Sequence, residues 1–189
     1  MGIHRAVNLR LASLTAIVSS VSGQVAIVLF PCLMIVASAL DVMTMRISNR
    51  LVSLTVLMFF PMAVASGMPI WLMGLHFATG LLLLTLGFAL FSLGLFGGGD
   101  GKLLAAAGLW LGFPCVLPFL LFTAAAGGVL AAAIGLWFML STEAGVRGGV
   151  LGKAFAPLRP ELPYGFAIAA GAILTVPLTR WMTLASLQT

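Results

Sequence analysis

Long apolar stretches alternate along this chain with short groups of glycine, proline and charged residues. Most of these stretches approach the 20 or so residues with which a helix crosses the hydrocarbon core of a bilayer. A backbone in lipid must satisfy its own hydrogen bonds, so we expect helices rather than isolated strands. The pattern predicts about six segments, at 20–40, 51–67, 70–93, 103–117, 119–141 and 163–181.

The boundaries of these segments lead to two further predictions. The fourth segment is short, and Pro118 separates it from the fifth, so the two are expected to form a tight helical hairpin. The N-terminus superficially resembles a signal peptide, but its apolar run continues to Leu40, which favours a retained first span. Residues 1–19 are interpreted as a tail or interfacial segment, and residues 20–189 as a single transmembrane domain.

Composition supports the same class of protein. The chain is 62% hydrophobic and 7% charged, with a mean hydropathy of +1.22. A soluble domain of this size could not bury so much apolar surface, so we expect an all-α, polytopic helical bundle in a membrane. Cys32 and Cys115 lie in apolar segments and are interpreted as small buried hydrophobes rather than a disulfide.

The positive charges predict an orientation in the membrane. The net charge of +5 fits the tendency of cationic residues to collect in cytoplasmic loops, so it does not call for a nucleic-acid partner. The loops after the first, third and fifth segments hold Arg46, Arg50, Lys102, Arg147, Lys153 and Arg159, and the opposite face holds Arg5, Arg10 and Arg180. The richer face is expected to be cytoplasmic, with both termini outside.

Two of the few acidic residues should meet at one face of the membrane. Asp41 ends the first segment and Asp100 precedes the fourth, with two spans between them. A pair of spans leaves a face and returns to it, so both carboxylates should lie at the same depth on the same side. This prediction holds whichever face is cytoplasmic.

A purely structural role is easier to assign to Asp100 than to Asp41. Asp100 could be an N-terminal cap of the fourth helix, and this remains open from its position alone. Asp41 lies at the carboxyl end of a helix, where the macrodipole disfavours an anion, which points to a functional role. As a close pair they would share one proton, with one acting as general base toward water and the other as general acid.

Other chemistries find less support. Phe96 and Leu103 break the phosphate-loop pattern around the glycines, and neither HExxH nor GxSxG occurs. No cluster of metal ligands is visible, so no metal or cofactor is expected. His76 is interpreted as a buried, hydrogen-bonding histidine. Lys102 is expected to extend toward lipid phosphates, with an ion pair to Asp100 open only if the glycine segment is not helical.

Three stretches resemble a known family in order along the chain. "DVMTMRISNRL" (41–51) and "GGGDGKLLAAAGLWLG" (97–112) are similar to the two aspartate motifs of type IV prepilin peptidases, which are membrane aspartic proteases of the GxGD kind. "PYGFAIAAGA" (163–172) is similar to the segment that opens the last helix of that family. The length resembles the short CpaA/TadV-like subgroup of Flp pili, which lacks the methyltransferase region. Ser48 stands where the family often has proline.

The resemblance implies roles for the matching residues. Asp41 and Asp100 would be the catalytic pair at the cytoplasmic face of a bacterial inner membrane, and Gly97, Gly98 and Gly99 would give Asp100 room to move. The substrate would be a prepilin helix in the bilayer, cut after its short basic leader. A role for Lys102 or Glu161 in holding that leader is left open, with Glu161 better suited by its charge.

Two other functions are weighed against this one. A small ion- or proton-coupled transporter would need polar residues throughout the bilayer depth, whereas such residues are sparse here. A non-catalytic subunit of a pilus or secretion assembly would not need both acids. Neither the oligomeric state nor the identity of the pilin substrate follows from these residues.

Overall fold

The computed structural model describes residues 2–44, 46–143 and 164–186, and these ranges are helical without a strand. This confirms the prediction of an all-α fold. The helices are α1 (Gly2–Thr44), α2 (Asn49–Ala65), α3 (Ile70–Ser92), α4 (Gly98–Leu111), α5 (Val116–Glu143), α7 (Tyr164–Thr175) and α8 (Arg180–Ala185), with short 3-10 turns η1 (Phe113–Cys115) and η3 (Val176–Leu178).

Three helical stretches are long and apolar enough to cross a membrane, namely Ser13–Thr44, Ile70–Ser92 and Phe113–Trp137. Helix α3 has 23 residues, or about 34 Å at 1.5 Å per residue, which matches the hydrocarbon core. Asn49–Ala65 and Tyr164–Leu178 are shorter apolar helices. The bundle is therefore that of a membrane protein, while six complete crossings and a boundary after residue 19 stay predictions. Helix α1 runs through that boundary without a break.

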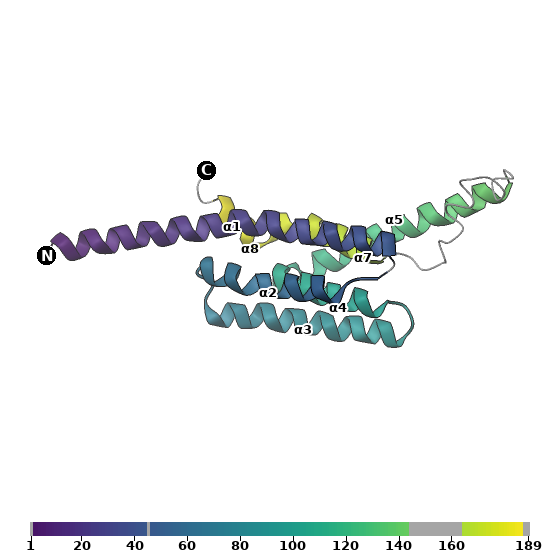
Figure 1. Cartoon of the computed structure of the whole chain (residues 1–189), viewed down its shortest axis with the longest axis horizontal. Helices are drawn as coiled ribbons and strands as arrows, with labels where there is room; N and C mark the ends of the chain where they lie inside the picture. The colour runs from purple at the N-terminus through teal and green to yellow at the C-terminus, as the bar shows by residue number, and fades with distance from the viewer. Residues whose placement is uncertain (1, 45, 144–163, 187–189) are drawn as a thin grey trace.

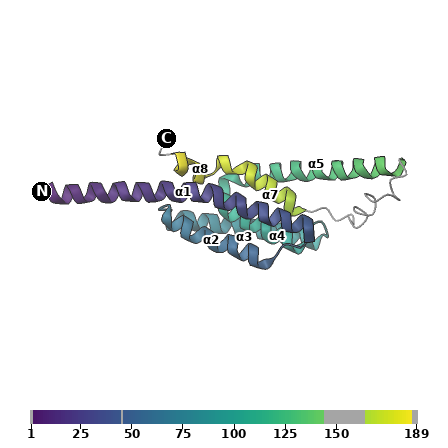
Figure 2. The same cartoon turned by 45° about the horizontal axis from the view of Figure 1, so that its top comes forward.

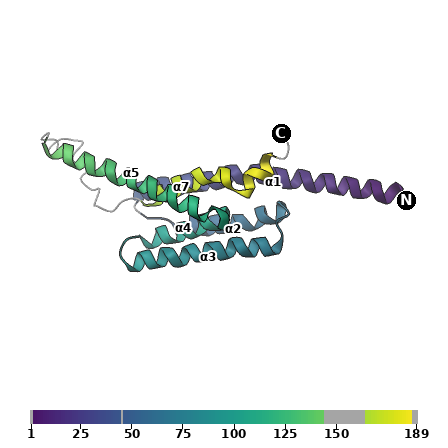
Figure 3. The same cartoon turned by 180° about the vertical axis from the view of Figure 1, so that it is seen from behind.

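The helices form an elongated bundle in which α1 lies beside α7 and α8, while α3 lies along α4 (Figures 1 and 2). Helix α1 extends past the bundle at its N-terminal end, and α5 extends past the opposite end (Figure 3). The end of α1 and the starts of α2, α4 and α7 gather at one end of the bundle (Figure 1). This arrangement brings segments that are far apart in sequence to a common place.

Helix α4 occupies the centre of the bundle. It packs against α2, α3 and α7, and most of its residues are buried. Its small residues permit close approach, as is common between helices in membranes. The closest approach is to α3, where a Cβ atom on Gly87 would lie only 2.6 Å from Cα of Gly101.

The predicted hairpin between the fourth and fifth segments is wrong. Helix α4 packs mainly against α3, and α5 packs mainly against α7. The break between α4 and α5 lies at Gly112, whose φ of +79° suits glycine, and at the following η1 turn. Pro118 lies instead in the first turn of α5, where its missing N–H breaks no intrahelical hydrogen bond.

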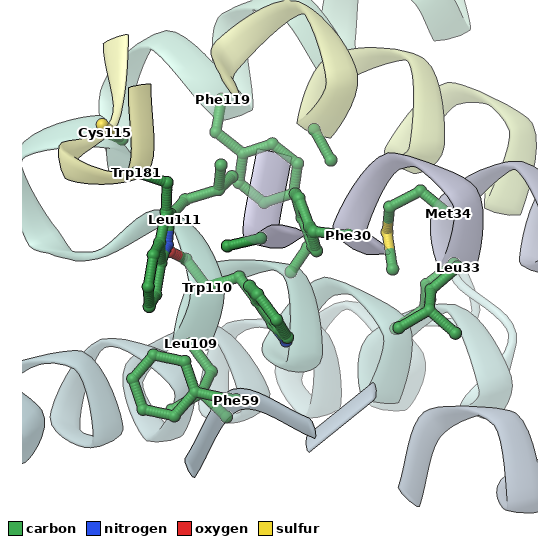
Figure 4. Close-up of a cluster of buried hydrophobic side chains, with 14 of the residues drawn as sticks. Phe30, Leu33, Met34, Phe59, Leu109, Trp110, Leu111, Cys115, Phe119 and Trp181 are labelled. Atoms are coloured by element: carbon green, nitrogen blue, oxygen red, sulfur yellow. The ribbon is translucent and has the colours of Figure 1, made fainter. Parts of the chain in front are cut away.

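An aromatic cluster fixes the part of the bundle around the C-terminal end of α4 (Figure 4). Phe30 stacks on Trp110 with ring centroids 5.3 Å apart, and Trp110 lies 5.6 Å from Trp181. The indole N–H of Trp110 donates to the carbonyl of Thr55 at 2.8 Å, and that of Trp181 donates to the carbonyl of Trp110 at 2.8 Å. These contacts hold α1, α2, α4 and α8 together, and both buried indole N–H groups have a hydrogen-bond acceptor.

Three further sequence interpretations have an outcome here. His76 is buried and its Nδ1 lies 2.7 Å from the carbonyl oxygen of Leu109, to which it donates, as expected of a structural histidine. Cys115 is buried and free, also as expected. The interpretation of Cys32 as buried is wrong, because its position on α1 faces outward and is exposed.

Candidate active site

Asp41 lies in the last turn of α1 and is buried, with 5% of its surface exposed. Its Oδ2 accepts a hydrogen bond of 2.9 Å from the backbone N–H of Gly165, at the start of α7. The first N–H groups of a helix have no intrahelical partner, and the helix dipole is positive there. Helix α7 thus supplies the favourable partner for an anion that the end of α1 does not provide.

Asp100 lies in the first turn of α4 and is also buried, with 9% exposed. Its Oδ2 accepts a hydrogen bond of 3.0 Å from the backbone N–H of Gly97, the residue that caps α4. The N-cap residue is thus Gly97 rather than Asp100, which lies at the third helical position and accepts the N–H of the N-cap with its side chain. The contact does not use the second carboxylate oxygen, so capping and acid–base chemistry are compatible.

The two carboxylates are close enough to influence each other's ionisation. The pKa of Asp100, which precedes the apolar part of α4, is raised from 3.8 to about 6. Burial away from water is the largest cause, the charge of Asp41 adds to it, and the hydrogen bond from Gly97 partly offsets it. A carboxyl group with this pKa can hold or release a proton near neutral pH.

The first turn of α7 contacts Asp41 directly and also contacts the residue that precedes the N–H donor of Asp100. Gly165 donates to Asp41, as described above, and the ring of Tyr164 packs on Phe96 with centroids 4.8 Å apart. Phe96 immediately precedes Gly97, the donor to Asp100. The site is thus built from the end of α1, the start of α4 and the start of α7.

Two of the glycines before Asp100, Gly97 and Gly99, serve close packing rather than an unusual backbone. Gly97 has a φ of −73°, and Gly98 and Gly99 are already helical. A Cβ atom on Gly97 would lie 2.9 Å from Oδ2 of Asp100, and one on Gly99 would lie 3.0 Å from Cβ of Ile47. One at Gly98 would make only ordinary contact. The expected mobility of this segment stays a prediction.

The other candidate residues have different positions. Lys102 is exposed, and its Nζ donates to Oδ1 of Asn49 at 3.0 Å, so it links the starts of α4 and α2. Because Gly98 and Gly99 are helical, the condition set for an ion pair with Asp100 is not met. Glu161 lies outside the described residues. Within those residues, no three His, Cys, Asp or Glu side chains come together as a metal site.

Tyr164 and Gly165 lie in the stretch 163–172 that resembles the family, but the sequence predicts no role for either residue. Gly165 is 124 residues from its partner Asp41 in the sequence. Neither the periodicity of apolar residues nor a local motif can predict a contact between residues so far apart. The available signal was a glycine at the start of an apolar helix, where backbone N–H groups are free to bind an anion.

Comparison with known proteins identifies one matching family. The model of the type IV leader peptidase family matches residues 28–132, which is more than half of the chain and includes both aspartates. No curated protein and no solved structure matches the chain significantly. The matched region ends before α7, so the contacts of Tyr164 and Gly165 are known from the structure alone.

Proposed function

Because the chain belongs to the type IV leader peptidase family, we propose that it is a membrane aspartic endopeptidase in which Asp41 and Asp100 form the catalytic dyad. Its substrates are prepilins or pilin-like precursors, from which it removes a short basic leader. The family membership indicates that the chain is a peptidase. The catalytic residues, the prepilin substrate and the cytoplasmic position of the site are what we propose.

The observation that carries this proposal is the pairing of two buried carboxylates at one end of the bundle. Each accepts one hydrogen bond from a glycine N–H among the described residues, and the second oxygen of each remains for water or substrate. Their mutual electrostatic effect, together with burial, raises the pKa of Asp100 to about 6. Two acids that do not ionise together are suited to sharing a proton.

Because the pair shares one proton, one carboxyl group can act as a base and the other as an acid in peptide hydrolysis. The ionised carboxylate takes a proton from water as the oxygen attacks the scissile carbonyl, while the protonated carboxyl donates its proton to the carbonyl oxygen. When the tetrahedral intermediate collapses, the C–N bond breaks, the first carboxyl delivers a proton to the leaving amine, and the second carboxylate takes back a proton from a hydroxyl of the intermediate. The pair returns to its singly protonated state, and its titration belongs to the two groups together.

The position of the dyad suits a substrate that is itself a membrane helix. Both aspartates lie where helices of the bundle begin or end, so a leader joined to a lipid-embedded helix would present its junction at the same level. The distribution of Lys and Arg supports a cytoplasmic position for this end in a bacterial inner membrane. A basic leader would also be attracted to acidic groups such as Glu161.

The test is co-expression with a candidate prepilin and detection of the shortened product. Asp41→Asn and Asp100→Asn keep the shape of the side chain and should each abolish cleavage, while membrane insertion and protein level stay unchanged. Glu143→Gln, at the end of α5, is the matched control and should cleave normally. Near-normal cleavage by either Asn variant would overturn the dyad.

The same experiment separates the other two functions. A transporter would leave the precursor uncleaved in the wild type and would show ion or proton flux that depends on the aspartates. An assembly subunit would leave the precursor uncleaved but would copurify with pilus components. Either result would replace the peptidase proposal.

A further inference from the structure

The contact between Gly165 and Asp41 requires an unusually close approach of the two helices. The backbone N–H of Gly165 lies 2.9 Å from Oδ2 of Asp41. A Cβ atom at position 165 would lie 2.6 Å from Oδ2 of Asp41 and 2.9 Å from its Cβ and Cγ. Real Cβ atoms essentially never lie under 3.0 Å from such neighbours. Any side chain here would displace the carboxylate, so glycine is what allows the hydrogen bond to form.

The neighbouring residue, Tyr164, packs on the segment that leads into Asp100. Tyr164 packs on Phe96 at a centroid distance of 4.8 Å, and an aromatic pair of this kind contributes about 0.5–1.5 kcal/mol beyond area burial. Phe96 is joined directly to Gly97, whose N–H binds Asp100. The first turn of α7 is therefore connected to both aspartates, to Asp41 through its backbone and to Asp100 through an aromatic contact.

We propose that the first turn of α7 is the positioning element of the dyad, with Gly165 orienting Asp41 and Tyr164 holding the segment that carries Asp100. This inference rests on the proposed function, since it takes the two aspartates as the catalytic groups. It adds a role for residues that do not touch the scissile bond.

The central test is Gly165→Ala, compared with Gly171→Ala and Gly127→Ala. Gly171 lies in the same helix, away from the dyad, and a Cβ there would lie 2.7 Å from the backbone nitrogen of Thr123. It therefore controls for crowding without contact to Asp41. Gly127 is the permissive control, because a Cβ there would meet only Cβ of Ala167 at 3.6 Å.

We expect Gly165→Ala to lower kcat by about 10- to 100-fold with little change in KM, since it misplaces a catalytic group. The acid limb of its pH profile of kcat/KM should shift to higher pH, because the ionised form of Asp41 no longer has its N–H donor. Gly171→Ala should lower the apparent Tm while the folded protein keeps its kcat and pH profile. If Gly165→Ala and Gly171→Ala lost kcat only in proportion to stability, the positioning role would be refuted.

A second arm does not depend on catalysis. Gly165→Ala should lower the apparent Tm of the wild type by about 2–10 °C, but should have little effect in an Asp41→Gly background, which lacks the three atoms nearest to the new Cβ. Equal losses in the two backgrounds would refute the contact. If this coupling held while Asp41→Asn still cleaved, the proposed function would fail and the structural part of the inference would stand.

Tyr164 supplies a variant that leaves the helix backbone unchanged. Tyr164→Phe keeps the ring that packs on Phe96 and should retain nearly full kcat. Tyr164→Leu removes the ring and should lower kcat several-fold at unchanged KM. Equal activity of the two variants would remove Tyr164 from the positioning element.

Discussion

The contact between α3 and α4 offers a quantitative test of how the bundle holds Asp100 in place. In Gly87→Ala, the new Cβ would lie 2.6 Å from Cα of Gly101, 3.1 Å from its carbonyl oxygen and 3.2 Å from its carbonyl carbon. Carbon atoms pack favourably at about 3.5–4.0 Å, so the two backbones must separate locally by about 1 Å. Neither partner is a flexible side chain that could move aside.

The magnitude follows from a comparison within the same helix. Replacing glycine by alanine in a helix gains up to about 1 kcal/mol, and overpacking a filled contact costs about 1–3 kcal/mol. A Cβ on Gly74, also in α3, would meet nothing within 4 Å. Both variants share the helix-forming gain, so Gly87→Ala should be about 1–3 kcal/mol less stable than Gly74→Ala.

The assay is thermal unfolding of the purified protein in detergent, together with the cleavage rate. For a chain of this length, each kcal/mol shifts the Tm by about 2–4 °C, so the two variants should differ by about 2–12 °C. Cleavage should fall in Gly87→Ala alone, because Gly101 directly follows Asp100. A Gly87→Ala protein as stable and as active as Gly74→Ala would refute the close packing of α3 on α4.

Further predictions concern charge and hydrogen bonds. Since the pKa of Asp100 is raised from 3.8 to about 6, the folded state binds this proton more tightly than the unfolded chain. Stability should fall as pH rises from about 4 to 6 and then level off, and Tm measurements on Asp100→Asn should lack that change. In Asp41→Asn the decline should begin at the same pH but end at lower pH, because the like charge that helps to raise the folded-state pKa of Asp100 is gone. Lys102→Met loses an exposed bond to Asn49 and should change unfolding free energy by less than about 0.5 kcal/mol. Trp110→Phe removes the indole donor to the carbonyl of Thr55 and part of the volume of a buried ring, and should cost about 1–3 kcal/mol in the same unfolding assay.

Topology explains why the meeting of Asp41 and Asp100 could be anticipated from the sequence. Apolar segments of membrane length alternate in direction, and two of them separate the acids, so the pair returns to one end whatever the packing details. The helical class follows equally directly from composition and the demands of a lipid-embedded backbone. Neither inference requires knowledge of which helices touch.

Packing partners could not be anticipated in the same way. The hairpin expected around Pro118 failed because proline is acceptable in the first turn of a helix as well as between helices. The close contact of Gly87 with Gly101 decides that α4 lies on α3, and a single glycine among many gives no indication of its partner. Gly165 was missed for the same reason, since its role depends on a carboxylate on a different helix.

The dependence of Asp41 on α7 has a consequence for the timing of biogenesis. A ribosome that has synthesised the chain as far as α5 has already produced both aspartates, yet the N–H donor for Asp41 is still to come. The site is complete only when α7 has entered the bundle. Newly made protein would therefore lack a fully positioned Asp41 during most of its own insertion and gain it late in assembly.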